Sequence, residues 1–406
     1  MYSRNCVCRG KDEFNDVLKG KRNPDTAGIP VTDITVPYPE IQKTPETEKP
    51  ETEKPETPGV PRISIDINPG KVSSKELVVK NSCSFDISIG MTGSDNGPSE
   101  GEECPEYQKY NGNGRCFWYL NTPDLLKPKE DWSVKLNTKG DHLISGTIWG
   151  TKAELMKESC PSGKCESWIG PVGAITKAEF TLSRSKTDFM DVSIIEGANI
   201  PMNMYPNDSD VDPEDRYDCG ISGTGSWDFQ PGNDLEKYVT MVTNVENAES
   251  CEIKDDCPGN LVCGSSFSTR PPIHGICGDF QGVSTAHFNC IAGSSSAPFF
   301  CESESEPISC QGIYSASGYN SPIGSTVCGC PDWESLGIDA PPVAPCTTSD
   351  KRWEEKSLPF LIFLKKACPL CYSFAYDDMS STVVCERSKK YTIEFCPDDT
   401  EKIFFG

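Results

Sequence analysis

Short runs in which apolar and polar residues alternate recur along the chain from Ile63 onward. Clusters of Gly, Pro, Asn and Asp separate these runs. Alternation places every second side chain on one face of an extended strand, and many short strands with frequent turns are typical of an antiparallel sandwich or barrel. We therefore predict a mainly β fold, with strands near residues 63–67, 76–80, 85–89, 132–136, 146–149, 178–182, 191–195 and 391–395.

One stretch late in the chain has the features of a helix. Residues 358–367 carry Pro359 in the first turn and Lys365 and Lys366 near the end, positions at which these residue types favour a helix. Cysteines crowd between Cys219 and Cys346, in a stretch rich in Ser, Gly and Pro. We expect a disulfide-rich loop subdomain there, containing a short helix and inserted into the β framework.

The N-terminal part of the chain has a different composition. Residues 44–58 repeat the unit Pro-Glu-Thr-Glu-Lys, in which proline blocks a continuous helix and a central strand, so we predict an extended linker. Residues 1–43 are polar and too short for a core of their own. We predict a disordered tail there, with the remnant of an upstream module as the alternative. The folded domain is then expected at 59–402, with its sandwich core at 60–152, 176–220 and 366–402 and the insert at 221–365.

The cysteine content indicates an oxidising compartment. The 406 residues include 22 cysteines, and structural disulfides are rare where glutathione keeps thiols reduced. We therefore expect a secreted protein, extracellular or in the cell wall, although a signal peptide is not visible in the sequence. No run of about 18 apolar residues occurs, so no transmembrane segment is expected.

The charge of the chain argues against a nucleic-acid partner. The sequence has 38 basic and 61 acidic residues, a net charge of −23, whereas binding to phosphates requires a basic surface. The linker carries five Glu and two Lys and residues 1–43 carry +1, which leaves −21 on residues 59–406. The acidity therefore belongs to the part of the chain that we expect to fold.

Several strings of residues resemble one family. They are Asp188 to Met202 (DFMDVSIIEGANIPM), Cys368 to Asp378 (CPLCYSFAYDD), Ser380 to Cys385 (SSTVVC) and Tyr391 to Pro397 (YTIEFCP). In this order they resemble the central and C-terminal segments of the thaumatin-like proteins, the family of thaumatin and osmotin. The resemblance runs from about Pro61 to Pro397, and residues 327–333 are more similar to the larger fungal members.

The resemblance implies a fold and a set of disulfides. The expected fold is a thaumatin-like antiparallel β-sandwich with the disulfide-rich loop subdomain beside it. The implied disulfides are Cys83–Cys396, Cys219–Cys385 and a local Cys160–Cys165 bond. Cys368 is expected to reach back to a cysteine at the start of the insert.

The same resemblance implies an acidic cleft that binds β-1,3-glucans and, in some members, cleaves them weakly. Glycoside hydrolysis uses two carboxyl groups on either side of the scissile bond. Matching the family position by position makes Glu179 and Asp191 the candidate catalytic acid and base. The candidate substrate-binding residues are Glu196, Asp377 and Asp378.

One departure from the family concerns charge in this cleft. Thr147 stands where the family has an arginine, so a fixed positive charge is missing. Either this change favours a protonated acid, or the site is no longer held for catalysis. A further alternative is that single acids are structural, because Asp in turns often accepts hydrogen bonds from backbone N–H groups.

We expect no metal and no cofactor. The three histidines, His142, His274 and His287, are scattered. Closely spaced cysteine pairs such as Cys368–Cys371 could bind zinc, but disulfides are the expected state in a secreted chain. Asn207 begins an Asn-Asp-Ser sequon, which predicts N-glycosylation in a polar loop.

These observations predict a secreted, monomeric thaumatin-like protein. It would bind a neutral cell-wall polysaccharide, β-1,3-glucan, in an acidic cleft. The sequence leaves open whether it only binds or also acts weakly as an endo-β-1,3-glucanase, a glycoside hydrolase. The alternative is a non-enzymatic antifungal defence protein or an inhibitor of another organism's hydrolases. A third hypothesis is a wall-associated structural module tethered by the linker.

Overall fold

The computed structural model describes residues 63–67, 73–95, 108–110, 116–137, 144–153, 174–183, 187–207, 215–229, 235–243, 245, 248–269, 271–285, 331–341, 351–356, 358–374, 377–386 and 388–405. All of them belong to one compact unit, which extends from Val60 to Gly406. The predicted tail (1–43) and linker (44–58) lie outside the described residues, so both stay predictions.

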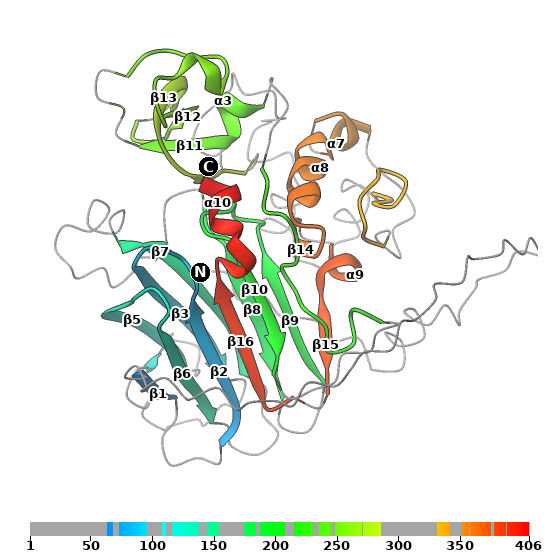
Figure 1. Ribbon diagram of the computed structural model, residues 1–406. Coiled ribbons are helices and arrows are strands. Elements are labelled where there is room, and N and C mark those ends of the chain that lie inside the picture. Colours follow the sequence, from blue (N-terminus) through cyan, green and yellow to red (C-terminus); the bar gives the residue numbers. More distant parts are fainter. Residues whose placement is uncertain are drawn as a thin grey trace, which may run out of the picture. The chain divides into compact units, whose positions relative to one another are not determined.

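Five strands form the first sheet, in the order β1-β6-β2-β16-β10 (Figure 1). Their bounds are β1 Ile63–Ile67, β2 Ser73–Asn81, β6 Asp131–Asn137, β10 Met202–Pro206 and β16 Lys390–Phe395. The β2–β6 and β10–β16 pairs are antiparallel, whereas β1–β6 and β2–β16 are parallel. The last strand in the sequence therefore pairs directly with β2, which lies more than three hundred residues earlier.

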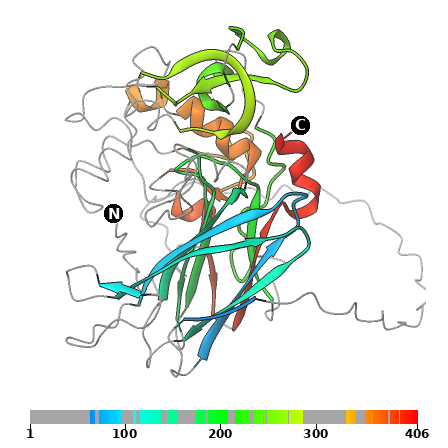
Figure 2. The ribbon, with the colours of Figure 1, turned by 90° about the vertical axis from the view of Figure 1, so that its left-hand side faces the viewer.

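Eight strands form the second sheet, in the order β14-β9-β8-β7-β3-β5-β4, and β15 also pairs with β9 (Figures 1 and 2). Their bounds are β3 Ile87–Asp95, β4 Gln108–Tyr110, β5 Cys116–Leu126, β7 Ile144–Lys152, β8 Lys177–Leu182, β9 Asp188–Ser193, β14 Cys371–Tyr372 and β15 Val383–Cys385. Neighbours in this sheet are antiparallel except for β14 and β9.

The two sheets share one apolar core. Leu77 and Ile393 of the first sheet and Ile148, Phe180 and Val192 of the second belong to the same buried cluster. Burying each side chain of this size stabilises the fold by about 1.5–3 kcal/mol. The mainly β sandwich predicted from the alternating pattern is therefore confirmed. Because strand side chains alternate, the opposite face of β7, β8 and β9 carries Thr147, Glu179 and Asp191, together with the buried Trp149 opposite Lys177.

The disulfide-rich insert has a small sheet of its own. It contains the helix α3 Glu236–Val239, the 3₁₀ helix η1 Lys254–Asp256, and strands β11 Thr240–Thr243, β12 Val262–Ser266 and β13 Ile273–Val283. Each of the three strands is hydrogen-bonded to the other two. Disulfides Cys251–Cys263 and Cys257–Cys277 pack with Leu261 into a separate apolar cluster. The two disulfides thus supply much of the stability that a larger apolar core would otherwise give this segment.

Four short helices lie near the end of the chain: α7 Lys351–Lys356, α8 Leu358–Ala367, α9 Asp378–Ser381 and α10 Thr400–Phe405; the 3₁₀ helix η2 Pro397–Asp399 precedes α10. Helix α8 has the bounds predicted for it, and Phe360 and Leu364 bury their side chains in the main core. Within the described ranges, none of the helices combines the length and apolarity needed to cross a membrane.

An aromatic cluster packs helix α10 against the framework and the insert. The Phe404 ring meets Trp227, Phe229 and Phe280 edge-on, at centroid distances of 6.4, 5.6 and 5.2 Å. The neighbouring Phe405 packs edge-on against Phe85 of the framework, at 5.5 Å. Edge-to-face pairs add about 0.5–1.5 kcal/mol each to the free energy gained by burial. The cluster therefore ties the insert residues around Phe280 to the C-terminal helix.

Replacing Phe404 by alanine is expected to lower the free energy of unfolding by about 3 kcal/mol, because the ring is 7% exposed and leaves a cavity behind. Urea denaturation followed by fluorescence measures the change. The matched control is Ile403→Ala in the same helix, where the side chain is 47% exposed and the change should stay within about 0.5 kcal/mol. Equal effects of the two substitutions would contradict the role given to the cluster.

Two long-range disulfides hold the framework. Cys83, just after β2, is bonded to Cys396, just after β16, across a sequence separation of 313 residues. Cys219 is bonded to Cys385 at the end of β15. Both are the pairs that the family resemblance implies. Cys160 and Cys165 lie outside the described residues, and their bond stays a prediction.

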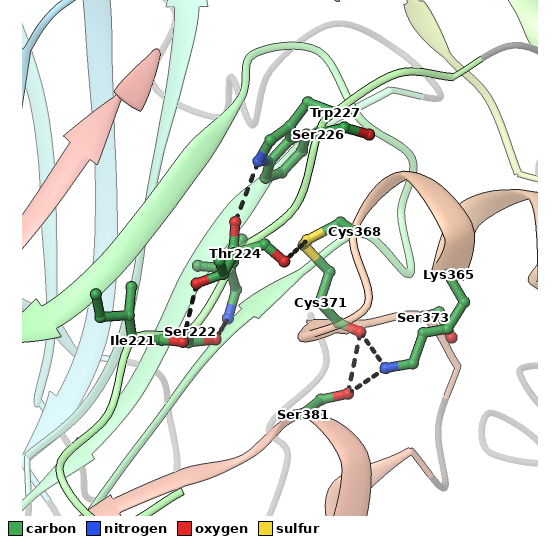
Figure 3. Close-up of a disulfide and its surroundings, with 12 residues drawn as sticks. Ile221, Ser222, Thr224, Ser226, Trp227, Lys365, Cys368, Cys371, Ser373 and Ser381 are labelled. Atoms are coloured by element: carbon green, nitrogen blue, oxygen red, sulfur yellow. Dashed lines mark hydrogen bonds between the residues drawn. A yellow bond between two sulfur atoms is a disulfide. The ribbon is translucent and has the colours of Figure 1, made fainter. Parts of the chain in front are cut away.

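The expectation for Cys368 is wrong. Cys368 is bonded to Cys371, three residues later, and not to a cysteine at the start of the insert. The structure nevertheless brings Cys368 to that start, because its sulfur atom lies 3.8 Å from the Thr224 carbonyl oxygen (Figure 3). This contact between the framework and the insert is therefore not covalent.

Candidate functional site

Glu179 and Asp191 lie directly opposite each other on adjacent strands. Strands β8 and β9 are antiparallel, and their register pairs Glu179 with Asp191. Both residues are half-buried, whereas Ala178, Phe180 and Val192 beside them point into the core. Side chains in such a pair have Cβ atoms about 4.5–5.5 Å apart. The structure therefore brings the two candidate catalytic acids together on one polar face.

The strand register also defines the rest of this face. Thr147 on β7 is paired with Glu179, and Thr92 on β3 is paired with Thr147. We call the surface formed by Thr147, Lys177, Glu179 and Asp191 the carboxylate face. The Thr147 hydroxyl oxygen is buried and has no hydrogen-bond partner among the described residues. Position 147 therefore places a small polar group, and no charge, beside Glu179.

Lys177 is a residue of this face that the sequence analysis missed. It lies two residues before Glu179 on β8, so alternation puts both side chains on the same side of the sheet. Its ammonium forms an ion pair with Glu196, and the two side chains are 15% and 36% exposed. Period-two spacing from Glu179 is the sequence signal that could have identified it. Glu196 thus contacts the carboxylate face through its ion pair with Lys177. It is not itself a residue of a neighbouring strand.

Asp377 has a different environment from the other candidates. Its side chain is completely buried and forms an ion pair with the equally buried Lys365, with Oδ2 2.9 Å from the ammonium nitrogen. Its oxygens also accept hydrogen bonds from the Trp333 indole N–H, the Ser373 N–H and hydroxyl, and the Ser380 hydroxyl. A carboxylate enclosed in this way has no room for a glycan. The predicted substrate contact by Asp377 therefore does not fit this structure, and the residue holds its surroundings together.

Lys365 extends the buried network around Asp377. Its ammonium donates to the Cys371 carbonyl oxygen at 2.7 Å and to the Ser381 hydroxyl at 2.8 Å (Figure 3). Burial lowers the pKa of the Lys365 ammonium, and the charge of Asp377 opposes that effect. Buried charges are tolerated only when they are paired and hydrogen-bonded. The network therefore joins α8 to α9 and to strand β14, which borders β9.

Asp378 differs from its neighbour Asp377 in burial and in its contacts. It is the first residue of α9 and is half-exposed. Its carbonyl oxygen accepts a hydrogen bond from the Thr382 N–H at 2.9 Å. An acidic residue in the first turn of a helix is favourable because it faces the positive end of the helix dipole. Its contact with a substrate stays a prediction.

The sequon asparagine lies at the end of strand β10. Asn207 is exposed, and its side-chain oxygen accepts a hydrogen bond from the Thr392 hydroxyl at 2.9 Å. Ser209, the third residue of the sequon, is outside the described residues. Glycosylation of Asn207 stays a prediction.

The described residues include one group with metal-ligand side chains close together. The sulfur atoms of Cys251, Cys257 and Cys277 lie within 4.8 Å of one another. All three are in disulfides, and zinc binds cysteine as the thiolate. His274 Nδ1 lies 2.6 Å from the hydroxyl of Ser265, a side chain that is completely buried. The disulfide-bonded cysteines therefore offer no thiolate to a metal ion.

A β-sandwich with a disulfide joining its early and last strands, a disulfide-rich insert and an acid pair on one sheet face defines the class of thaumatin-like proteins. A family model described as the Thaumatin family matches residues 120–330 and 344–397, more than half of the chain. The chain therefore belongs to the thaumatin family.

Two thaumatin-like relatives share about a quarter of the aligned residues with this chain. The pathogenesis-related thaumatin-like protein 3.5 of Cryptomeria japonica is 24% identical, with 62% of this chain and 70% of that protein aligned. Thaumatin-like protein 1 of Pyrus pyrifolia is 25% identical over 62% of this chain and 72% of its own. Among solved structures, the thaumatin-like xylanase inhibitor TLXI is 18% identical over 32% of this chain and 74% of its own, with a TM-score of 0.20. So low a TM-score supports no inference from that structure to this one.

Proposed function

We propose that this protein is a secreted thaumatin-like protein that binds β-1,3-glucan of cell walls through the carboxylate face. The observation that carries the proposal is the direct opposition of Glu179 and Asp191 on β8 and β9. Carboxylate oxygens accept hydrogen bonds from sugar hydroxyls. The net charge of −21 on residues 59–406 would repel anionic polymers, so a neutral polysaccharide is the favoured ligand.

The same pair supports a weak endo-β-1,3-glucanase activity. Retaining glycosidases hold their two carboxyl groups about 5–5.5 Å apart, and inverting enzymes about 6.5–9.5 Å apart. Directly opposed residues on antiparallel strands favour the shorter separation. In this proposal Glu179 and Asp191 act as the acid/base pair, and Glu196 and Asp378 support the glucan around them.

Replacing Glu179 by glutamine is expected to reduce the release of reducing ends from a soluble β-1,3-glucan at least a hundredfold, because a general acid or base typically contributes 10²–10⁴-fold. Reducing-end release and affinity electrophoresis in the same glucan are the two measurements. The control is Glu334→Gln, an exposed carboxylate outside the face, which should leave both unchanged. If the Glu179 variant releases reducing ends as fast as the native protein, the catalytic role is refuted.

A non-enzymatic function is the second candidate. Two observations favour binding without turnover: position 147 carries no cation, and Asp377 is enclosed in the core. The protein would then act as a defence protein or as an inhibitor of foreign hydrolases. A pull-down on insoluble β-1,3-glucan, run beside inhibition assays on foreign glycoside hydrolases, separates the two. Inhibition without glucan binding would replace the first proposal by the second.

A further inference from the structure

The carboxylate face has an uneven distribution of charge. Alternation along the described strands puts Ser145 and Thr147 of β7 and Thr92 of β3 on this side of the sheet, and none of them is charged. Strand β9 adds Asp191, flanked by Phe189 and Ser193, and β14 adds Tyr372 opposite Ser193. Within these strands, the charged groups on the face are thus Glu179, Asp191 and Lys177.

Lys177 is held in place by a well-anchored partner. Glu196 lies in the turn between β9 and β10, and its carbonyl oxygen accepts the Ile175 N–H at 3.1 Å. The Asn199 side chain in the same turn accepts the Thr176 N–H at 2.8 Å and donates to the Gly150 carbonyl oxygen at 2.7 Å. The turn is therefore fixed to β7 and to the start of β8. A side chain paired with a fixed partner is itself preorganised.

The position of the Lys177 ammonium affects the charge balance between Glu179 and Asp191. Like charges directly across a strand pair destabilise the sheet, and a nearby opposite charge offsets their repulsion. Residues i and i+2 of a strand are roughly 6.5 Å apart along its axis, so Lys177 lies one step from Glu179 on its own strand. The register pairs Lys177 with Ser193, which makes Asp191 its diagonal neighbour.

We propose that Lys177 is a positioning residue of the carboxylate face, in the role of the arginine that position 147 lacks. Its ammonium, held by Glu196, offsets the repulsion between Glu179 and Asp191 and lets both carboxylates stay on the face at once. The meaning of this arrangement for glucan binding rests on the proposed function. The charge balance itself does not, so it can be tested without a glycan.

A double-mutant cycle tests the charge balance. Lys177→Met keeps most of the length and apolar volume of the side chain, and Glu179→Gln removes one of the opposed charges. In the Lys177→Met background, Glu179→Gln is expected to raise the urea midpoint of unfolding, because it removes a repulsion that is no longer offset. In the native background the same substitution should leave the midpoint unchanged or lower it. Equal shifts in both backgrounds would overturn the proposal, since a merely structural lysine would give additive effects.

Two further variants keep the test decisive. Lys177→Arg retains the charge and is expected to restore native behaviour in the cycle. If the Lys177→Met variant does not fold, Lys177→Gln takes its place in the cycle. Glu179→Gln is then expected to raise the urea midpoint of unfolding in the Lys177→Gln background as well. Only the Lys177→Arg variant keeps the positive charge. If the Lys177→Arg and Lys177→Gln variants behave alike in the cycle, the proposed role of the Lys177 charge is refuted.

The second measurement on the Lys177 variants is their affinity for a soluble β-1,3-glucan. Lys177→Met is expected to weaken binding about tenfold, equivalent to the loss of one charge-assisted contact, and Lys177→Arg to restore it to within about twofold. If the native protein does not bind the glucan, the proposed function fails while the cycle still decides the role of Lys177. If the native protein binds and the cycle is additive, the inference about Lys177 fails alone.

Discussion

Replacing Asp377 by alanine is expected to lower the free energy of unfolding by about 3–5 kcal/mol, because the Lys365 ammonium would remain buried without its counter-ion. Both side chains are completely buried, and their charged atoms are 2.9 Å apart. The substitution also removes the acceptor of the Trp333 and Ser373 hydrogen bonds. Urea denaturation, followed by near-UV circular dichroism of the buried tryptophans, measures the loss.

The adjacent aspartate is the matched control for this experiment. Asp378→Ala alters a half-exposed residue in the first turn of α9 and should cost less than about 1 kcal/mol. The double variant Lys365→Met/Asp377→Leu removes both charges and should recover part of the stability lost by the single change. Recovery should be incomplete, because the partner hydroxyls and indole N–H stay unsatisfied. An Asp377 variant as stable as the Asp378 variant would contradict the buried-pair account.

Removing the disulfide between Cys83 and Cys396 by replacing both residues with alanine is expected to cost about 5 kcal/mol. The bond joins positions separated by 313 residues, and the chain-entropy account predicts a stabilisation that grows with the length of the closed loop, reaching about 5 kcal/mol for loops of a hundred residues or more. The bond also sits where β2 and β16 end, so its loss loosens the parallel pair at the centre of the first sheet. Thermal and urea unfolding of the variant measure the effect.

The short disulfide of the same chain is the reference for this prediction. Cys368 and Cys371 are separated by 3 residues, and the same account gives about 2 kcal/mol for so small a loop. All four cysteines are buried, so replacement by alanine removes a similar apolar volume in each case. The difference between the two double variants isolates the loop length. Equal losses would show that loop closure is not what makes the long disulfide stabilising.

Local patterns in the sequence were sufficient for much of the fold and for the centre of the site. Alternation predicted strands at 178–182 and 191–195. The first is β8 almost in full, the second overlaps β9 at 191–193, and both acids lie on the half-buried side of these strands. The bounds of α8 followed from its proline and lysines. These predictions worked because they depend on neighbours within one element, where the spacing of residues determines which side chains share a face.

Other features depend on residues that are distant in sequence. Asp377-Asp378 has the composition of a surface turn, and nothing nearby in the sequence indicates that Trp333 and Lys365 enclose the first of the two. The Cys368 sulfur atom lies 3.8 Å from the carbonyl oxygen of Thr224, a contact across 144 residues that no local pattern in the sequence indicates.

The sequence by itself therefore determined the family, the β framework and the strand face that carries Glu179 and Asp191. Tertiary structure alone decided which acids lie half-buried on a strand face and which are enclosed, because burial and ion pairing depend on segments that meet only when the chain folds. It also placed Lys177 beside the acid pair with Glu196 as its partner. Since position 147 is a threonine and not the family's arginine, the charge at the site is in our proposal balanced by a lysine of strand β8 itself.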